Sequence, residues 1–224
     1  MRSSAQSPSR PSWLRVVEND APEPRPEPKI SDEDIISAFE RGDGSTSSQL
    51  YDRLIGTVDR TLYRVLGQRD QEHDDLVQSA FEQIMLTLSK GRFARACSLS
   101  TWASTITAHV ALNALRSRTR ERRVVDRCCD AEVESQRLPA RVDVEHQAGL
   151  QEQLGQLRAE LAQMTPEKAT TVLLYEVLGH ELAEIAVMTN VSVAAAQSRL
   201  VRGRKELQQR MEAALASRSR RKQP

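Results

Sequence analysis

Apolar residues recur at every third or fourth position along much of this chain, which is the spacing of helices that each bury one face. Between residues 47 and 66 the regularly spaced apolar positions are Leu50, Leu54, Val58, Leu62 and Val65. Between residues 72 and 88 they are Leu76, Ala80, Ile84 and Leu88. Aromatic residues make up only 4% of the chain, and good helix formers dominate it. We therefore expect an all-α protein built from small helical bundles.

Two interruptions of this periodicity divide the chain. The first 30 residues alternate proline with charged residues, which favours an extended, solvated tail. A polar stretch that contains Pro139 follows the first group of helices, and we interpret it as a flexible linker between two domains. The predicted organisation is a tail, a helical domain, a linker, a second helical domain and a basic tail, at residues 1–30, 31–120, 121–148, 149–216 and 217–224. The first domain is expected to end with a helix over residues 100–119, and the second with a helix over residues 193–216.

The positive charges are clustered, although the formal net charge of the chain is only +1. Five arginines lie between residues 116 and 123, four cations between residues 199 and 205, and four between residues 218 and 222. Local fields rather than the total charge determine where phosphates bind, so this distribution favours a nucleic-acid ligand. A charged face turned to solvent is the alternative for each cluster.

Several other classes of protein lack support in the sequence. The three cysteines and four histidines do not have the spacing of a metal site, so no metal or other cofactor is expected. No nucleophile–base pair or phosphate-binding glycine loop is evident, which argues against an enzyme. No apolar run is long enough to span a membrane, and the N-terminus lacks a secretory signal. The expected location is the cytoplasm.

The most specific local pattern indicates a helix-turn-helix between residues 180 and 207, with the sequence HELAEIAVMTNVSVAAAQSRLVRGRKEL. Its apolar residues are expected to anchor the two helices, at Leu182, Ile185, Ala186, Val191, Val193, Ala196 and Leu200. Polar residues of the second helix would then face outward and contact duplex DNA, with Gln, Arg and Ser suited to base edges and phosphates. These candidates are Gln197, Ser198, Arg199, Arg202 and Lys205. The alternative is an amphipathic hairpin with a charged outer face.

The segment MTPEKATTVLLYEVLG and the helix-turn-helix after it resemble region 4 of extracytoplasmic-function (ECF) sigma factors of bacterial RNA polymerase. Upstream, HDDLVQSAFEQIMLTL resembles region 2.2, and LSTWASTITAHVALNALRSRTRERR resembles the region that reads and melts the promoter. The resemblance implies a promoter-recognition subunit that binds core RNA polymerase, at its β′ clamp and β flap regions, and reads the −10 and −35 elements of promoter DNA. An anti-sigma protein is a further partner suggested by the resemblance alone.

The resemblance also assigns roles to residues of the first domain. It places a polymerase-binding surface at Asp74, Asp75, Gln78 and Phe81, although a solvated acidic helix start is the alternative. It places strand opening at the −10 element at Phe93, Trp102, His109, Arg116 and Arg118. In this set Phe93 would stack on a flipped base, worth about 1–3 kcal/mol, or pack in the core instead. Trp102 is expected to be mainly a core residue, and His109 either bonds a base edge or is simply a neutral ring.

Four positions depart from the family pattern. At one of them, His109, the family usually has a polar amide. The family often has an aromatic residue where this chain has Ser104, and basic residues where it has Thr105 and Ala108. The strand-opening helix is therefore poorer in rings and charge than expected. Two alternatives to an active sigma factor follow: a degenerate sigma that binds polymerase without melting DNA, and an autonomous helix-turn-helix regulator that dimerises through a leucine stripe at residues 150–161.

Overall fold

The structure is a computed structural model that describes residues 31–128 and 142–221. This part of the chain is helical and contains no strand, which confirms the all-α prediction. Its elements in chain order are α1 (Asp32–Glu40), η1 (Gly44–Thr46), α2 (Ser47–Leu66), α3 (His73–Ser89), α4 (Leu99–Cys128), α5 (Val142–Gln163), α6 (Pro166–Val172), η2 (Leu173–Val177), α7 (Leu182–Met188) and α8 (Val193–Arg221). None of the described helices is both long enough and apolar enough to cross a membrane.

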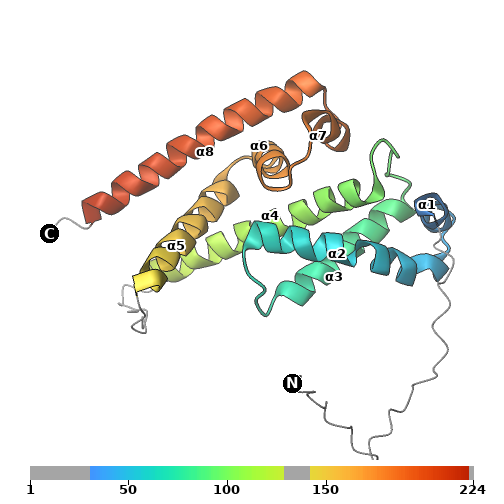
Figure 1. Ribbon diagram of the computed structural model, residues 1–224, viewed down its shortest axis with the longest axis horizontal. Helices are drawn as coiled ribbons and strands as arrows, with labels where there is room; N and C mark the ends of the chain where they lie inside the picture. The colour runs from blue at the N-terminus through green and yellow to red at the C-terminus, as the bar shows by residue number, and fades with distance from the viewer. Residues whose placement is uncertain (1–30, 129–141, 222–224) are drawn as a thin grey trace, which may run out of the picture.

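Helices α1 to α4 form the first bundle (Figure 1). The apolar stripes predicted for α2 and α3 are its core, since Leu50, Leu54, Leu62, Ile84 and Leu88 are all completely buried. Ser31 caps α1, because its side-chain oxygen accepts a hydrogen bond from the backbone N–H of Asp34 at 3.2 Å. The helix bounds follow those expected from the sequence within one or two residues up to the start of α4.

The two helices that flank the predicted linker extend beyond their expected ends. Helix α4 continues to Cys128 instead of ending near residue 119, and α5 already begins at Val142. The predicted linker at 121–148 is therefore helical at both of its ends, and its central part lies outside the described residues. Arginine and glutamate are good helix formers, and the Ser117 hydroxyl donates to Glu121 along the helix at 2.9 Å. A continuous run of residues with high helix propensity therefore extends α4, although this segment has no apolar periodicity.

Helices α6 to α8 carry the predicted helix-turn-helix. Pro166 occupies the first position of α6, and the Thr165 side chain before it makes no capping hydrogen bond. The turn between α7 and α8 is closed by a hydrogen bond from the N–H of Val191 to the carbonyl of Ala186 at 2.9 Å. Asn190 takes a left-handed conformation there, with φ of 52°. Ser192 caps α8, because its side-chain oxygen accepts a hydrogen bond from the N–H of Ala195 at 3.2 Å.

The second helical group packs directly against the first. Helix α5 lies along the C-terminal part of α4, and α6 and α7 lie between α8 and the N-terminal half of α4 (Figure 1). Buried apolar residues of both groups belong to one continuous hydrophobic cluster. The linker therefore joins two domains that are in contact with each other.

Candidate nucleic-acid interface

The outer face of α8 presents most of the polar residues predicted to contact duplex DNA. Gln197, Arg202 and Lys205 are exposed, and Ser198 and Arg199 are half-buried at the edge of the same face. On the opposite face, Ala196 and Leu200 are buried against the rest of the domain, as are Ile185 and Ala186 of α7. One predicted anchor is wrong: Val193 is 49% exposed, because the first turn of α8 projects beyond the domain core.

A glycine fixes how closely α8 approaches α6. A Cβ atom added at Gly203 would lie 2.7 Å from Cγ2 of Val172 and 3.4 Å from the carbonyl oxygen of Lys168. Lys168 and Glu206 join the same two helices through an ion pair of 2.7 Å. Close backbone approach and the ion pair together orient the reading face of α8.

The cations of α8 fall into two groups. Arg204 forms an ion pair with Glu176, and its guanidinium lies 5.1 Å from the centroid of the Tyr175 ring. The pKa of this guanidinium is raised, mainly by the hydrogen bond to Glu176. Arg210 pairs with Glu206 and Glu160. The ion pairs that α8 makes within the described part of the chain thus use these arginines and Glu206. Arg199, Arg202 and Lys205 are not among them, and Arg202 and Lys205 are exposed to solvent.

The predicted polymerase surface on α3 divides into exposed and buried residues. Asp74, Asp75 and Gln78 are exposed on the first two turns of the helix. Phe81 is only 5% exposed, and its ring centroid lies 4.6 Å from that of Tyr51 on α2. The ring of Phe81 thus belongs to the core between α2 and α3, and a direct contact of this residue with the polymerase stays a prediction.

The predicted base-stacking ring is also a core residue in this structure. Phe93, in the loop between α3 and α4, is 6% exposed and packs against Trp102, with ring centroids 4.9 Å apart. Trp102 is partly buried against the core, in agreement with the expectation for it. Phe93 is thus not available to stack on a base in this conformation, because its ring fills the space under the loop.

Arg116 and Arg118 make contacts within the protein instead of pointing freely to solvent. Arg118 pairs with both Asp70 and Glu72, at 2.8 Å each, and so ties α4 to the loop before α3. Arg116 donates from Nε to the carbonyl of Ala162 at 3.3 Å, and burial lowers its pKa. Each guanidinium already has an acceptor in this conformation, and the role of both residues as phosphate-binding cations stays a prediction.

His109 lies on the outer side of α4 and remains accessible to solvent. Partial desolvation by surrounding side chains lowers its pKa, and the positive charge of Arg116 acts in the same direction. The ring is therefore neutral near pH 7.

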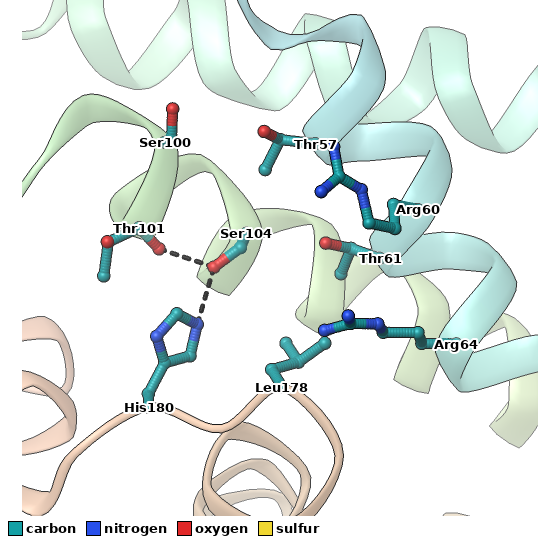
Figure 2. Close-up of a pocket in the computed structure, with 9 residues that line it drawn as sticks. All are labelled: Thr57, Arg60, Thr61, Arg64, Ser100, Thr101, Ser104, Leu178 and His180. Carbon is teal, nitrogen blue, oxygen red and sulfur yellow. Dashed lines mark hydrogen bonds between the residues drawn. The ribbon is translucent and has the colours of Figure 1, made fainter.

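An open cavity of about 190 Å³ lies where α2, the start of α4 and the segment before α7 meet (Figure 2). Arg60 and Arg64 reach into it from α2, toward Ser104 of α4 and His180 of the second domain. The remaining lining residues are Thr57, Thr61, Ser100, Thr101 and Leu178, so the lining contains no carboxylate. A site of this composition suits an anion such as a DNA phosphate.

Arg60 and Arg64 were not predicted from the sequence as site residues. A signal was nevertheless present, because Thr57, Arg60, Thr61 and Arg64 have helical spacing and form one polar stripe on α2. The apolar stripe of the same helix is the more evident of the two patterns. Only the fold shows that this polar face turns toward the start of α4.

Two family models match the chain in the order expected. "Sigma-70 region 2" matches residues 50–121, which include α2, α3 and most of α4. "Sigma-70, region 4" matches residues 154–207, which include the helix-turn-helix and the reading face of α8. Together they account for more than half of the chain. The chain belongs to the sigma-70 family. Its region 2 and region 4 are those of the ECF class, so this sigma factor is a promoter-recognition subunit that binds RNA polymerase and promoter DNA.

Solved structures of sigma factors are similar to this one at low sequence identity. One is described as CnrH in complex with the cytosolic domain of CnrY; it is 18% identical, covers 81% of this chain and 97% of its own, and has a TM-score of 0.45. Another is described as the sigma factor RpoE in complex with the anti-sigma factor NepR from Bartonella quintana. It is 18% identical, covers 74% of this chain and 96% of its own, and has a TM-score of 0.41. Among curated proteins, no sequence matches.

Proposed function

We propose that this sigma factor reads the −35 element as duplex DNA with the outer face of α8. The observation that carries the proposal is the combination of exposed Gln197, Arg202 and Lys205 with the buried anchors Ala196 and Leu200 on the opposite face. A helix held in this way inserts its N-terminal part into the major groove, where Gln suits adenine and Arg suits guanine. Ser198 and Arg199 flank the same face, and Lys205 is placed to contact a phosphate.

We further propose that region 2 opens the −10 element along the N-terminal half of α4. The cavity lined by Arg60 and Arg64 offers positive charge beside the hydroxyl groups of Ser100, Thr101 and Ser104. Such a surface suits the backbone of an unpaired strand, which needs cations and hydrogen-bond donors more than base-specific contacts. His109 and Trp102 lie on the same helix, and Phe93 takes part only if its ring leaves the core.

Contact with core polymerase is proposed at two places. Asp74, Asp75 and Gln78 form an exposed polar face at the start of α3 that fits a basic surface, and the resemblance assigns it to the β′ clamp. Region 4 is assigned to the β flap in the same way. An anti-sigma partner for this sigma factor also remains a proposal.

The sigma-70 family consists of transcription initiation factors that are not enzymes. For this chain we propose that phosphodiester bonds are formed by the polymerase alone and that the protein works in the cytoplasm, where the polymerase is. A second candidate function, a sigma factor that binds polymerase without melting DNA, is favoured by one observation: Ser104 and Thr105 of α4 are covered by the second domain.

Transcription in vitro with core polymerase and a library of promoters tests these functions. Initiation from a defined subset of promoters is the expected result. Binding of core polymerase without open complexes, detected by permanganate reactivity of unpaired thymines, would support the second candidate. Binding to a palindromic site in the absence of polymerase would overturn both and favour an autonomous regulator.

A further inference from the structure

Another open cavity, of about 230 Å³, lies where the end of α2, the C-terminal half of α4 and α5 meet. Figure 1 shows α5 lying along this part of α4, and we call the space the α4–α5 cavity. Its charged lining consists of Arg118 and Arg122 from α4 and Arg158 from α5. Every other described residue that lines it is uncharged. A lining with three cations and no carboxylate favours an anionic ligand.

Arg158 is held in place at this cavity by the backbone at the end of α2. It donates from Nε to the carbonyl of Val65 at 2.9 Å, and its guanidinium packs against Gly67, where an added Cβ atom would overlap it. Neither Nη group has an acceptor within the parts of the chain that the structure describes. Burial lowers the pKa of this guanidinium, and no carboxylate acts in the opposite direction. Arg158 therefore has both a fixed position and donors that remain available.

The two arginines of α4 differ in how far their charge is compensated. Arg118 pairs with both Asp70 and Glu72, at 2.8 Å each, so these carboxylates neutralise it. Arg122 is exposed and takes part in none of the ion pairs between described residues. The charges of Arg122 and Arg158 are therefore the ones left uncompensated at the α4–α5 cavity. A partly buried cation in this situation gains free energy when an anion pairs with it.

The uncharged polar residues and the size of the cavity narrow the class of ligand. The Thr119 hydroxyl already donates to the carbonyl of Leu115 at 2.7 Å, and the Gln68 amide donates to Asp70 at 3.2 Å. Gln151 is exposed, and its amide is a further donor at the cavity. Sites for drug-sized ligands usually have about 300–1,000 Å³, so this cavity suits a smaller ligand. A compact anion fits better than a whole nucleotide.

We propose that the α4–α5 cavity binds a phosphate dianion, either inorganic phosphate or the phosphate group of a small monoester. Arg158 and Arg122 are its ligands, because a guanidinium presents parallel N–H groups that match two phosphate oxygens. Their two charges match a phosphate monoester, which carries about −1.5 to −2 at pH 7, whereas each phosphodiester of DNA carries a single charge. The lining comes from both domains, so binding also stabilises their contact.

Calorimetric titration of the full chain tests the ligand class with three probes: inorganic phosphate, methyl phosphate and dimethyl phosphate. Sodium chloride keeps the ionic strength constant. We expect one site for the first two probes and an affinity about tenfold lower for dimethyl phosphate, which has one charge fewer. The tighter of the two dianions identifies the source of the phosphate. Equal affinity for dimethyl phosphate would overturn the proposal in favour of a DNA phosphate, and no binding of either dianion would overturn it outright.

Two neighbouring arginines provide a matched pair of variants. Arg122→Gln is expected to weaken phosphate binding about tenfold, as for the loss of one charge-assisted hydrogen bond. Arg123→Gln serves as the control, because Arg123 is equally exposed but does not line the cavity. Circular dichroism checks that both variants are folded. Equal affinity in the two variants would overturn the assignment of Arg122 as a ligand.

Nuclear magnetic resonance locates the anion without altering Arg158, whose bond to Val65 also joins the two domains. The amide signals of Gly155 and Arg158 are expected to shift as inorganic phosphate is added, while those of Thr57 and Ser100 at the other arginine-lined cavity stay unchanged. Shifts confined to Thr57 and Ser100 would overturn the proposal. None of these measurements uses DNA or polymerase, so their outcome does not depend on the proposed function.

Discussion

A hydrogen bond of 2.8 Å joins Nε2 of His180 to the hydroxyl of Ser104 across the boundary between the two domains, over a separation of 76 residues. Its other ring nitrogen, Nδ1, lies 3.6 Å from the carboxylate of Glu184. Desolvation lowers the pKa of His180 and outweighs the opposite effect of Glu184. The packed arrangement of the two domains, which we call the docked state, is therefore made with a neutral imidazole.

This relationship predicts that acidification weakens the docking. The docked ring has a lower pKa than a solvated histidine, so the undocked state binds more protons as the pH falls below about 6.5. Stability of the docked state is full above this pH and decreases as the pH falls toward the lowered pKa. Arg60 and Arg64 line the same cavity, and Glu184 offsets only part of the effect of desolvation on the pKa of His180.

Small-angle scattering between about pH 7.5 and 5.5 measures this effect as a rise in the radius of gyration. His180→Gln serves as the control, because its side-chain amide can donate or accept a hydrogen bond and cannot titrate. Expansion that persists in this variant would assign the proton to another group, such as His109.

Gly203→Ala is expected to destabilise the second domain by about 1–3 kcal/mol, because its Cβ atom would overlap Val172 across the α6–α8 contact. Gly155→Ala is the matched control on α5, where an added Cβ atom meets nothing within 4 Å. The control is expected to be neutral or to stabilise by up to about 1 kcal/mol, since alanine favours the helix. Urea unfolding of both variants measures the difference. Equal effects would show that α6 and α8 are not closely packed in solution.

Arg199→Ala is expected to weaken binding to the −35 duplex by about 1–3 kcal/mol and to relax the preference at one base pair. Lys205→Ala is expected to weaken binding to all sequences similarly and to reduce its salt dependence, as for a lost phosphate contact. Gln209→Ala, an exposed residue further along α8, serves as the control. Selection from a randomised −35 library measures each preference, and an unchanged preference in Arg199→Ala contradicts its role.

Phe93→Ala is expected to lower the free energy of unfolding by about 3–5 kcal/mol, because the ring is buried against Trp102. The effect is measured by chemical denaturation, with Phe93→Leu as the variant that keeps most of the buried apolar volume. If Phe93→Ala unfolds like wild type but forms fewer open complexes, the ring acts on DNA instead of in the core.

Local patterns were sufficient for most of the secondary structure. The stripes of α2 and α3, the capping residues Ser31 and Ser192, and the helix-turn-helix are each encoded within one or two helical turns of sequence. Their spacing and cap chemistry do not depend on distant contacts. The ordered pair of sigma-like motifs was equally visible, because each motif is contiguous in the chain.

Contacts between distant segments determined the rest. The sequence showed that Phe81, Phe93, Arg116 and Arg118 are rings and cations, but their burial or pairing depends on Tyr51, Trp102, Ala162 and the Asp70–Glu72 loop, which other elements supply. The same holds for the cavity beside Arg60 and Arg64, and for the cover over Ser104. Whether a segment is helical depends on residues that are close together in the sequence. The accessibility of a helix face depends instead on which other helix packs against it, and for the start of α4 it depends on the packing of the second domain.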